Sequence, residues 1–140
     1  MSTNTLKFKI ATPDRVVYEN DVEQVSIPTT SGEITVHPNH ISMVTVVKPG
    51  ELRIIKDGQI LPHYVAGGTL EIRPDNTMVL LANISERAED IDIAAAEDAY
   101  NRACEAMERK DAVSDVDFAK FQGIMERELS RMNVAKKWRK

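Results

Sequence analysis

The sequence has little cysteine, few aromatic residues and no long apolar run. One residue of 140 is a cysteine, Cys104, which excludes an internal disulfide and is typical of a reducing compartment. The apolar runs are far shorter than the ~20 residues that a membrane-spanning helix requires. The N-terminus lacks the profile of a signal or transit peptide. We therefore expect a soluble intracellular protein that meets a membrane only through other proteins.

The sequence also lacks an excess of basic residues. Its 18 Lys and Arg against 22 Asp and Glu give a net charge of −4, which argues against nucleic acid as the main partner. The length of 140 residues is enough for one ordinary domain, or for a small domain with a helical appendage, and 42% hydrophobic residues is too high for a disordered chain.

Proline and glycine are almost absent from the last third. No proline follows Pro74, and after it the only glycine is Gly123. Because these residues punctuate strands and turns, the change predicts a β domain over residues 1–86 and an α domain over residues 87–140.

The first domain shows the alternation of half-buried strands. Leu6, Phe8 and Ile10 alternate with lysines, and Asp57-Gly58 and Pro74-Asp75-Asn76 are hairpin turns. Strands are expected over residues 6–10, 15–19, 22–27, 33–36, 43–47, 52–56, 59–65, 69–73 and 77–82. This spacing predicts an antiparallel β-sandwich or barrel, and so an α+β fold once the second domain is included.

The second domain shows two helical seams. Asp90 or Asp92 caps the first helix, and Ser114 with Asp117 begins the second after an interruption at residues 110–113. The expected seams are Ile93, Ala96, Tyr100, Ala103 and Met107, then Phe118, Phe121, Met125, Leu129 and Met132. The short connection predicts an antiparallel hairpin, and its narrow, alanine-rich seam predicts low stability.

Candidate chemical sites are few. His37, His40 and His63 are conceivable metal ligands, but a histidine loop that contacts a partner fits Pro38-Asn39 better. Gly67-Gly68 lacks the spacing of a phosphate-binding loop and is interpreted as a turn entering a strand. The sequence predicts no set of catalytic residues and no metal site.

The chain ends on a basic segment. Lys136 and Lys137 precede Trp138-Arg139-Lys140, and Arg127 and Arg131 lie upstream in the same predicted helix. These cations have two possible roles. They either interact favourably with the helix dipole at the C-terminus, or form an electrostatic binding site for acidic protein surfaces or phosphates.

Three ordered blocks resemble a known family. They are Gly32-Glu33-Ile34-Thr35-Val36-His37-Pro38-Asn39-His40 with Lys48-Pro49-Gly50-Glu51-Leu52-Arg53-Ile54, then Gly67-Gly68-Thr69-Leu70-Glu71-Ile72, and Ser85-Glu86-Arg87-Ala88-Glu89-Asp90-Ile91-Asp92. Across nearly its whole length the sequence resembles the epsilon subunit of bacterial F-type ATP synthases.

The resemblance implies a ten-stranded sandwich in a non-catalytic rotor subunit, at the cytoplasmic face of the plasma membrane. In the family this domain contacts the gamma subunit and the ring of c subunits, which makes Glu33, Pro38 and His40 interface candidates. Thr35 and Asn39 stand where many members have glycine. Asparagine tolerates a left-handed backbone, so the turn at Asn39 is expected to survive.

The family's two-helix domain is a mobile inhibitor of ATP hydrolysis. When extended, it reaches the catalytic head of alpha and beta subunits. The resemblance thus assigns Arg127, Arg131, Lys136 and Lys137 to an inhibitory basic strip.

Some members also bind ATP in this domain. The matching positions here are Glu86, Ile91, Asp92, Arg102, Arg127 and Arg131. Ala95 replaces the arginine of the family's motif, so the forked donor is lost and ATP binding is expected to be weak or absent, with no other cofactor.

Two alternatives remain. A β-sandwich adaptor with a helical-hairpin tail, unrelated to the motor, would show the same periodicities but not the three ordered blocks. A small metal-dependent enzyme built on the histidines would contain bound zinc when purified.

Overall fold

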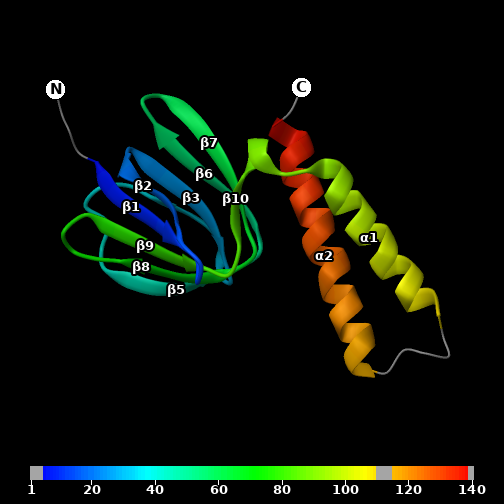
Figure 1. The fold of residues 1–140 in the computed structure, drawn as a ribbon. Coiled ribbons are helices and arrows are strands. Elements are labelled where there is room, and N and C mark those ends of the chain that lie inside the picture. Colours follow the sequence, from blue (N-terminus) through cyan, green and yellow to red (C-terminus); the bar gives the residue numbers. More distant parts are fainter. Residues whose placement is uncertain (1–4, 110–114, 139–140) are drawn as a thin grey trace. The chain divides into compact units, whose positions relative to one another are not determined.

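The structure is a computed structural model that describes residues 5–109 and 115–138 (Figure 1). The chain divides into two compact units, Met1–Arg87 and Ala88–Lys140. The expected helix connection at residues 110–113, the expected cap Ser114 and the last two residues lie outside the described part of the chain.

The first unit consists of strands. They are β1 (Leu6–Ala11), β2 (Val16–Val22), β3 (Gln24–Thr29), β4 (Gly32–Val36), β5 (Met43–Val47), β6 (Gly50–Lys56), β7 (Gln59–Val65), β8 (Gly68–Ile72), β9 (Thr77–Ala82) and β10 (Ser85–Arg87). The break between β2 and β3 falls at Glu23, later than predicted, because Asn20 and Asp21 continue the ladder with β1.

The strands form one folded sheet in the order β10-β7-β6-β3-β5-β8-β9-β1-β2, with β4 paired to β3 (Figure 1). Nine strand pairings are formed by the described residues. The prediction of an antiparallel sandwich is confirmed for eight of them and is wrong for one, since β1 and β9 run parallel. These two strands are far apart in sequence, so no hairpin turn dictates their relative direction.

The two halves of the sheet enclose the core. Leu6, Phe8 and Ile10 of β1 point inward and are at most 1% exposed, as their alternation predicts. The Tyr18 ring of β2 packs edge-on against the His63 ring of β7, with centroids 5.7 Å apart. Since β2 and β7 belong to opposite ends of the sheet order, this contact shows that the sheet closes over itself.

The second unit is helical. It contains a short 3-10 helix η1 (Ala88–Asp90), α1 (Ile93–Glu108) and α2 (Asp115–Trp138), and α1 and α2 pack side by side (Figure 1). Of the two predicted caps, Asp92 is the N-cap of α1, and its Oδ1 accepts a hydrogen bond from the Ala95 N–H at 3.0 Å. None of the described helices combines the length and the apolarity that crossing a bilayer demands.

The seam of α2 differs from the prediction at two positions. Phe118 and Leu129 are about half exposed, whereas Glu128 is 4% exposed. Glu128 lies at spacings of three and four residues from Met125 and Met132, which places it on the same face of the helix. A charged residue therefore takes the buried place that we assigned to its apolar neighbour.

Candidate functional site

The predicted interface residues lie on β4 and the loop after it. The Glu33 side chain is 50% exposed, and one of its carboxylate oxygens accepts a hydrogen bond from Arg53 Nη2 at 2.5 Å. Arg53 also reaches Glu51 at 3.3 Å. Partial burial lowers the pKa of Arg53, but its hydrogen bonds to both carboxylates outweigh this effect and raise the pKa overall. The arginine thus fixes Glu33 in an accessible position.

A pair of asparagines holds the loop that contains Pro38 and His40. Asn39 and Asn76 both have positive φ angles, 68° and 62°. The Asn39 N–H donates to Asn76 Oδ1 at 2.6 Å, and Asn76 Nδ2 donates to Asn39 Oδ1 at 3.4 Å. The predicted left-handed conformation of Asn39 is therefore confirmed, and its side chain adds a contact to the β8–β9 turn that glycine cannot make. His40 is half-buried, with Nδ1 within 2.8 Å of the Ile41 carbonyl oxygen.

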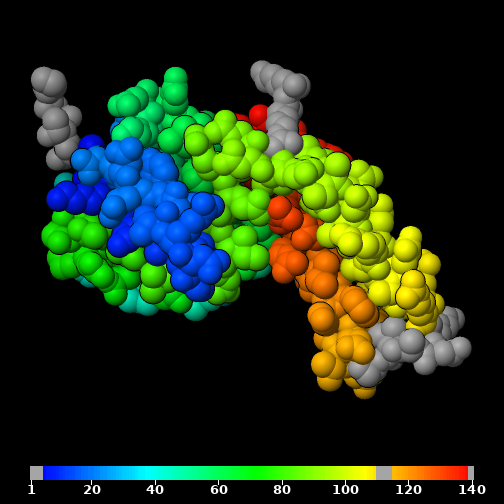
Figure 2. Space-filling view, viewed as in Figure 1, coloured from blue at the N-terminus to red at the C-terminus, as the bar shows by residue number. Residues whose placement is uncertain are grey.

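The outer face of the sheet carries an apolar row that the sequence analysis missed. The strand register aligns Val46, Thr69, Leu81, Ala11 and Val16 across five neighbouring strands. The three large apolar side chains of this row are 49–57% exposed. We call these five residues the outer row. Residues of β1 and β2, drawn in blue, lie at the front of the strand unit in Figure 2.

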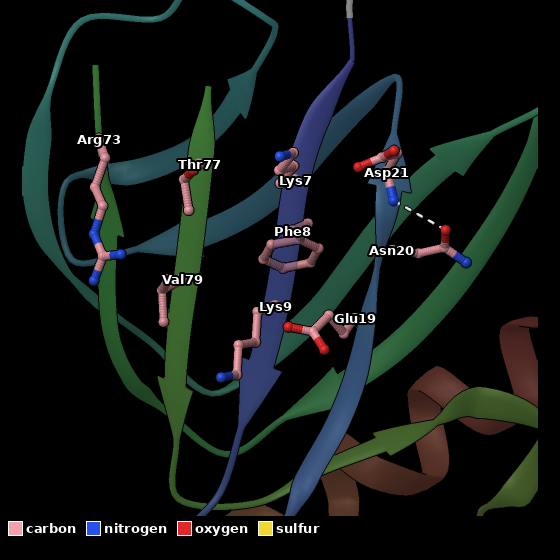
Figure 3. Close-up of a pocket in the computed structure, with 9 residues that line it drawn as sticks. All are labelled: Lys7, Phe8, Lys9, Glu19, Asn20, Asp21, Arg73, Thr77 and Val79. Atoms are coloured by element: carbon pink, nitrogen blue, oxygen red, sulfur yellow. Dashed lines mark hydrogen bonds between the residues drawn. The ribbon is translucent and has the colours of Figure 1, made fainter. Parts of the chain in front are cut away.

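A charged pocket of about 500 Å³ adjoins the outer row (Figure 3). Its lining residues come mainly from β1, β2 and β9, and they are Lys7, Phe8, Lys9, Glu19, Asn20, Asp21, Arg73, Thr77 and Val79. The register sets Lys9 opposite Glu19 and Lys7 opposite Asp21, so the basic side chains of β1 lie beside the acidic side chains of β2. Such a surface favours a partner with charges of both signs.

In the helical unit, the structure brings two of the candidate ATP-binding residues together. Arg102 of α1 and Arg127 of α2 line a pocket of about 300 Å³, whose other walls are Ala99, Ala103, Phe121 and Ile124. The Asp92 carboxylate is engaged as a helix cap, and Ile91 is buried. Glu86 lies on β10 and thus belongs to the other unit.

The other candidate cations of α2 lie on different faces. Arg131 lies one turn beyond Arg127, whereas five residues separate Arg131 from Lys136, a rotation of roughly 140° about the helix axis. The Lys137 ammonium lies 5.4 Å from the centroid of the Trp138 ring. The four basic residues therefore form an arginine pair and a separate lysine cluster.

Glu128 joins the arginine pair. Its Oε2 accepts a hydrogen bond from Arg131 Nη1 at 2.6 Å, and its Oε1 accepts one from Arg127 Nε at 3.4 Å. Sequence reasoning missed this residue because charged side chains are normally exposed, although its spacing from Met125 and Met132 was visible in the sequence.

Among the described residues, the three histidines are not grouped as metal ligands would be. His63 is buried in β7, whereas His37 is exposed after β4. Within residues 5–109 and 115–138, no three His, Cys, Asp or Glu side chains are grouped as metal ligands would be.

Comparison with known families covers both units. Residues 5–88 match the family model "ATP synthase, Delta/Epsilon chain, beta-sandwich domain", and residues 89–136 match "ATP synthase, Delta/Epsilon chain, long alpha-helix domain". The chain belongs to the delta/epsilon family of ATP synthase subunits.

Individual relatives agree with the family assignment. The chain is 40% identical over 133 residues to the ATP synthase epsilon chain of Bacillus subtilis, which covers 95% of this chain and 98% of that one. It is 37% identical over 131 residues to the epsilon chain of Herpetosiphon aurantiacus, covering 94% of each. The prediction drawn from the three sequence blocks is thereby confirmed.

Solved structures show the same fold at low identity. One is the Euglena gracilis mitochondrial ATP synthase, with a TM-score of 0.69 and 15% identity over 97% of this chain and 80% of the matched chain. The other is the central stalk and c-ring of the Tetrahymena thermophila mitochondrial ATP synthase, with a TM-score of 0.61 and 14% identity over 98% of each chain.

Proposed function

We propose that this delta/epsilon-family chain is a non-catalytic rotor subunit of an F-type ATP synthase, located in the central stalk at the cytoplasmic face of the bacterial plasma membrane. The outer row is the observation that carries this proposal. The row crosses five strands, and its two valines and one leucine, on three of those strands, are about half exposed. Exposed apolar side chains in one patch are typical of a surface that another protein covers. We assign this surface to the gamma subunit.

The c-subunit ring is the proposed partner of Glu33, Pro38 and His40. Glu33 is held by Arg53 and remains half exposed, and the asparagine pair fixes the backbone beside His40. A carboxylate and an imidazole in fixed positions are suited to hydrogen bonding with the polar loops of a neighbouring subunit.

A direct binding experiment tests the rotor assignment. The full chain is expected to form a one-to-one complex with the gamma subunit of the same organism in size-exclusion chromatography. Failure to bind would contradict the rotor assignment and would favour an adaptor unrelated to the motor.

The helical unit is proposed to inhibit ATP hydrolysis by contacting acidic segments of the catalytic head. Deleting residues 88–140 should raise the hydrolysis rate of the reconstituted complex about fivefold or more, the lower end of a typical coupling between sites. Steady-state hydrolysis at saturating ATP measures this effect. Lys120→Gln, which removes an exposed charge near the start of α2, is the control and should leave the rate unchanged. An unchanged rate after the deletion would rule out inhibition by this unit.

ATP binding by the isolated chain is expected to be weak. Arg102 and Arg127 line one pocket. However, Ala95 in the first turn of α1 stands at the position of the motif's arginine, so the guanidinium group that would bind phosphate is missing there. Isothermal titration calorimetry should therefore show no saturable binding at micromolar ATP. A micromolar dissociation constant would contradict this expectation.

A further inference from the structure

Strand β5 is paired along its whole length on one side but only at its end on the other. On the first side it pairs with β8 over Met43–Val47. On the second side, within the described residues, its pairing with β3 is confined to Val47 opposite Thr29. A hydrogen bond from the Thr30 N–H to the Val46 carbonyl oxygen, 3.1 Å long, flanks that pair. The backbone of residues 43–45 on this second side is the open edge of β5.

The backbone groups of Val44 point toward the open edge. In a β-strand the N–H and C=O of one residue face one neighbouring strand, and those of the next residue face the other. The Val46 C=O faces β3, so the Val44 groups, two residues earlier, face the same side and point away from β8. The Val44 side chain is 68% exposed. Val44 therefore presents a donor, an acceptor and an apolar side chain to solvent.

The segment that carries the open edge is uncharged and rich in β-branched residues. Residues 41–47 contain no charged residue and no proline, and five of the seven are Ile, Val or Thr. The Ile41 side chain, just before the strand, is 78% exposed, and that of Val46 is 55% exposed. An edge of this composition pairs readily with another extended chain, so it requires a partner that covers it.

Other edges of the described sheet carry features that oppose such pairing. Strand β2, at one end of the sheet order, has Glu19, Asn20 and Asp21 in succession. Strand β10, at the other end, is three residues long, and β4 carries Glu33 in its ion pair with Arg53. Charge and short length are the usual protections of an edge strand. The open edge of β5 has no charge, which makes it suited to strand addition.

The open edge continues the outer row. Val46 is next to the open edge in β5 and is aligned with Thr69 of β8 and Leu81 of β9 in the outer row. A partner that covers the outer row therefore meets the open edge on the same strand. An extended segment of that partner would bind through main-chain hydrogen bonds. Its side chains are expected to be uncharged, because a charge buried beside Val44 would lose its hydration without a counter-ion.

We propose that an extended, uncharged segment of the gamma subunit adds to β5 as a further strand, with hydrogen bonds to the N–H and C=O of Val44. The inference rests on the proposed function, because it takes the partner that covers the outer row to be the gamma subunit. Strand addition gives the exposed backbone groups of β5 their hydrogen-bond partners in the assembled enzyme.

Amide hydrogen exchange of the full chain, with and without the gamma subunit, tests the main-chain contact. The Val44 N–H should exchange rapidly in the free chain and about tenfold or more slowly in the complex. The Glu19 N–H is the matched control on the charged edge of β2. It points away from β1, as does the Asp21 C=O two residues later, which accepts a hydrogen bond from Lys56 of β6. Its exchange rate should change less than about threefold.

Two substitutions separate main-chain pairing from side-chain packing. Val44→Pro removes the N–H and keeps an apolar side chain, and proline is tolerated where a strand N–H faces an open edge. It should weaken gamma binding about tenfold, the effect of roughly one backbone hydrogen bond. Val44→Ile keeps both the N–H and a β-branched side chain, and should change the affinity less than about threefold. Equal affinities of the two variants would overturn the proposal.

The exchange experiment needs no substitution, so it decides the question even if Val44→Pro does not fold. If the unchanged chain does not bind the gamma subunit, the rotor assignment and the proposed occupant both fail. If gamma binds while the Val44 N–H keeps its exchange rate, or while Glu19 is protected equally, the rotor assignment stands and strand addition is wrong. A dimer of the chain alone with a protected Val44 N–H would make a second copy the occupant and overturn the assignment to gamma.

Discussion

Replacing Gly68 by alanine is expected to unfold the β-sandwich. A Cβ atom on Gly68 would lie 2.2 Å from the Leu81 carbonyl oxygen and 2.9 Å from the Ala82 Cα. Both are backbone atoms of the neighbouring strand, so no side-chain rotation relieves the overlap. We expect a loss of about 4 kcal/mol or more in the free energy of unfolding, a large fraction of the total stability of such a domain. Urea unfolding followed by circular dichroism measures the loss.

Gly123→Ala is the matched control for this substitution. Gly123 lies within α2, and no atom is within 4 Å of the position of an added Cβ. Alanine is favoured over glycine in a helix by about 1 kcal/mol, so this variant should stabilise the helical unit. A Gly68→Ala protein as stable as the original would show that β8 and β9 are able to separate without disturbing the sheet.

Leu81→Asp is expected to abolish binding of the gamma subunit while leaving the sandwich folded. Leu81 is 57% exposed at the centre of the outer row, so the charge is tolerated in the free chain. In the proposed complex the carboxylate would be buried without a partner, and affinity should fall about 100-fold or more. Surface plasmon resonance with immobilised gamma subunit measures the change.

Ile60→Asp controls for the effect of adding one negative charge. Ile60 is 46% exposed on β7 and lies outside the outer row. It should reduce affinity far less than Leu81→Asp. Equal effects of the two substitutions would place the gamma-binding surface elsewhere on the sandwich.

Local sequence patterns predict most of this fold. The alternation of Leu6, Phe8 and Ile10 identifies the inner face of β1, and Asp92 marks the start of α1. These features depend on residues close together in sequence, where one periodicity or one cap determines the structure.

Several features that the sequence did not predict depend on pairing between distant segments. The outer row requires the register of β5, β8, β9, β1 and β2 together, and no single strand shows it. The hydrophobic pattern also did not predict that Leu129 is exposed and Glu128 is buried. Charged residues are normally assigned to the exposed face of a helix, but Arg127 and Arg131 compensate the charge of Glu128. The ion pair between Arg53 of β6 and Glu33 of β4 likewise joins two residues that are twenty positions apart in the sequence.

The parallel pairing of β1 with β9 has a consequence for biosynthesis. Lys7 aligns with Thr77, so the first strand emerges from the ribosome long before its parallel neighbour is made. Contacts so distant in sequence form slowly, because a long loop must close before they stabilise the chain. One edge of the β1–β2 hairpin therefore stays unpaired until translation has passed Ala82. During this interval the unpaired strand edge makes the nascent chain most prone to aggregation.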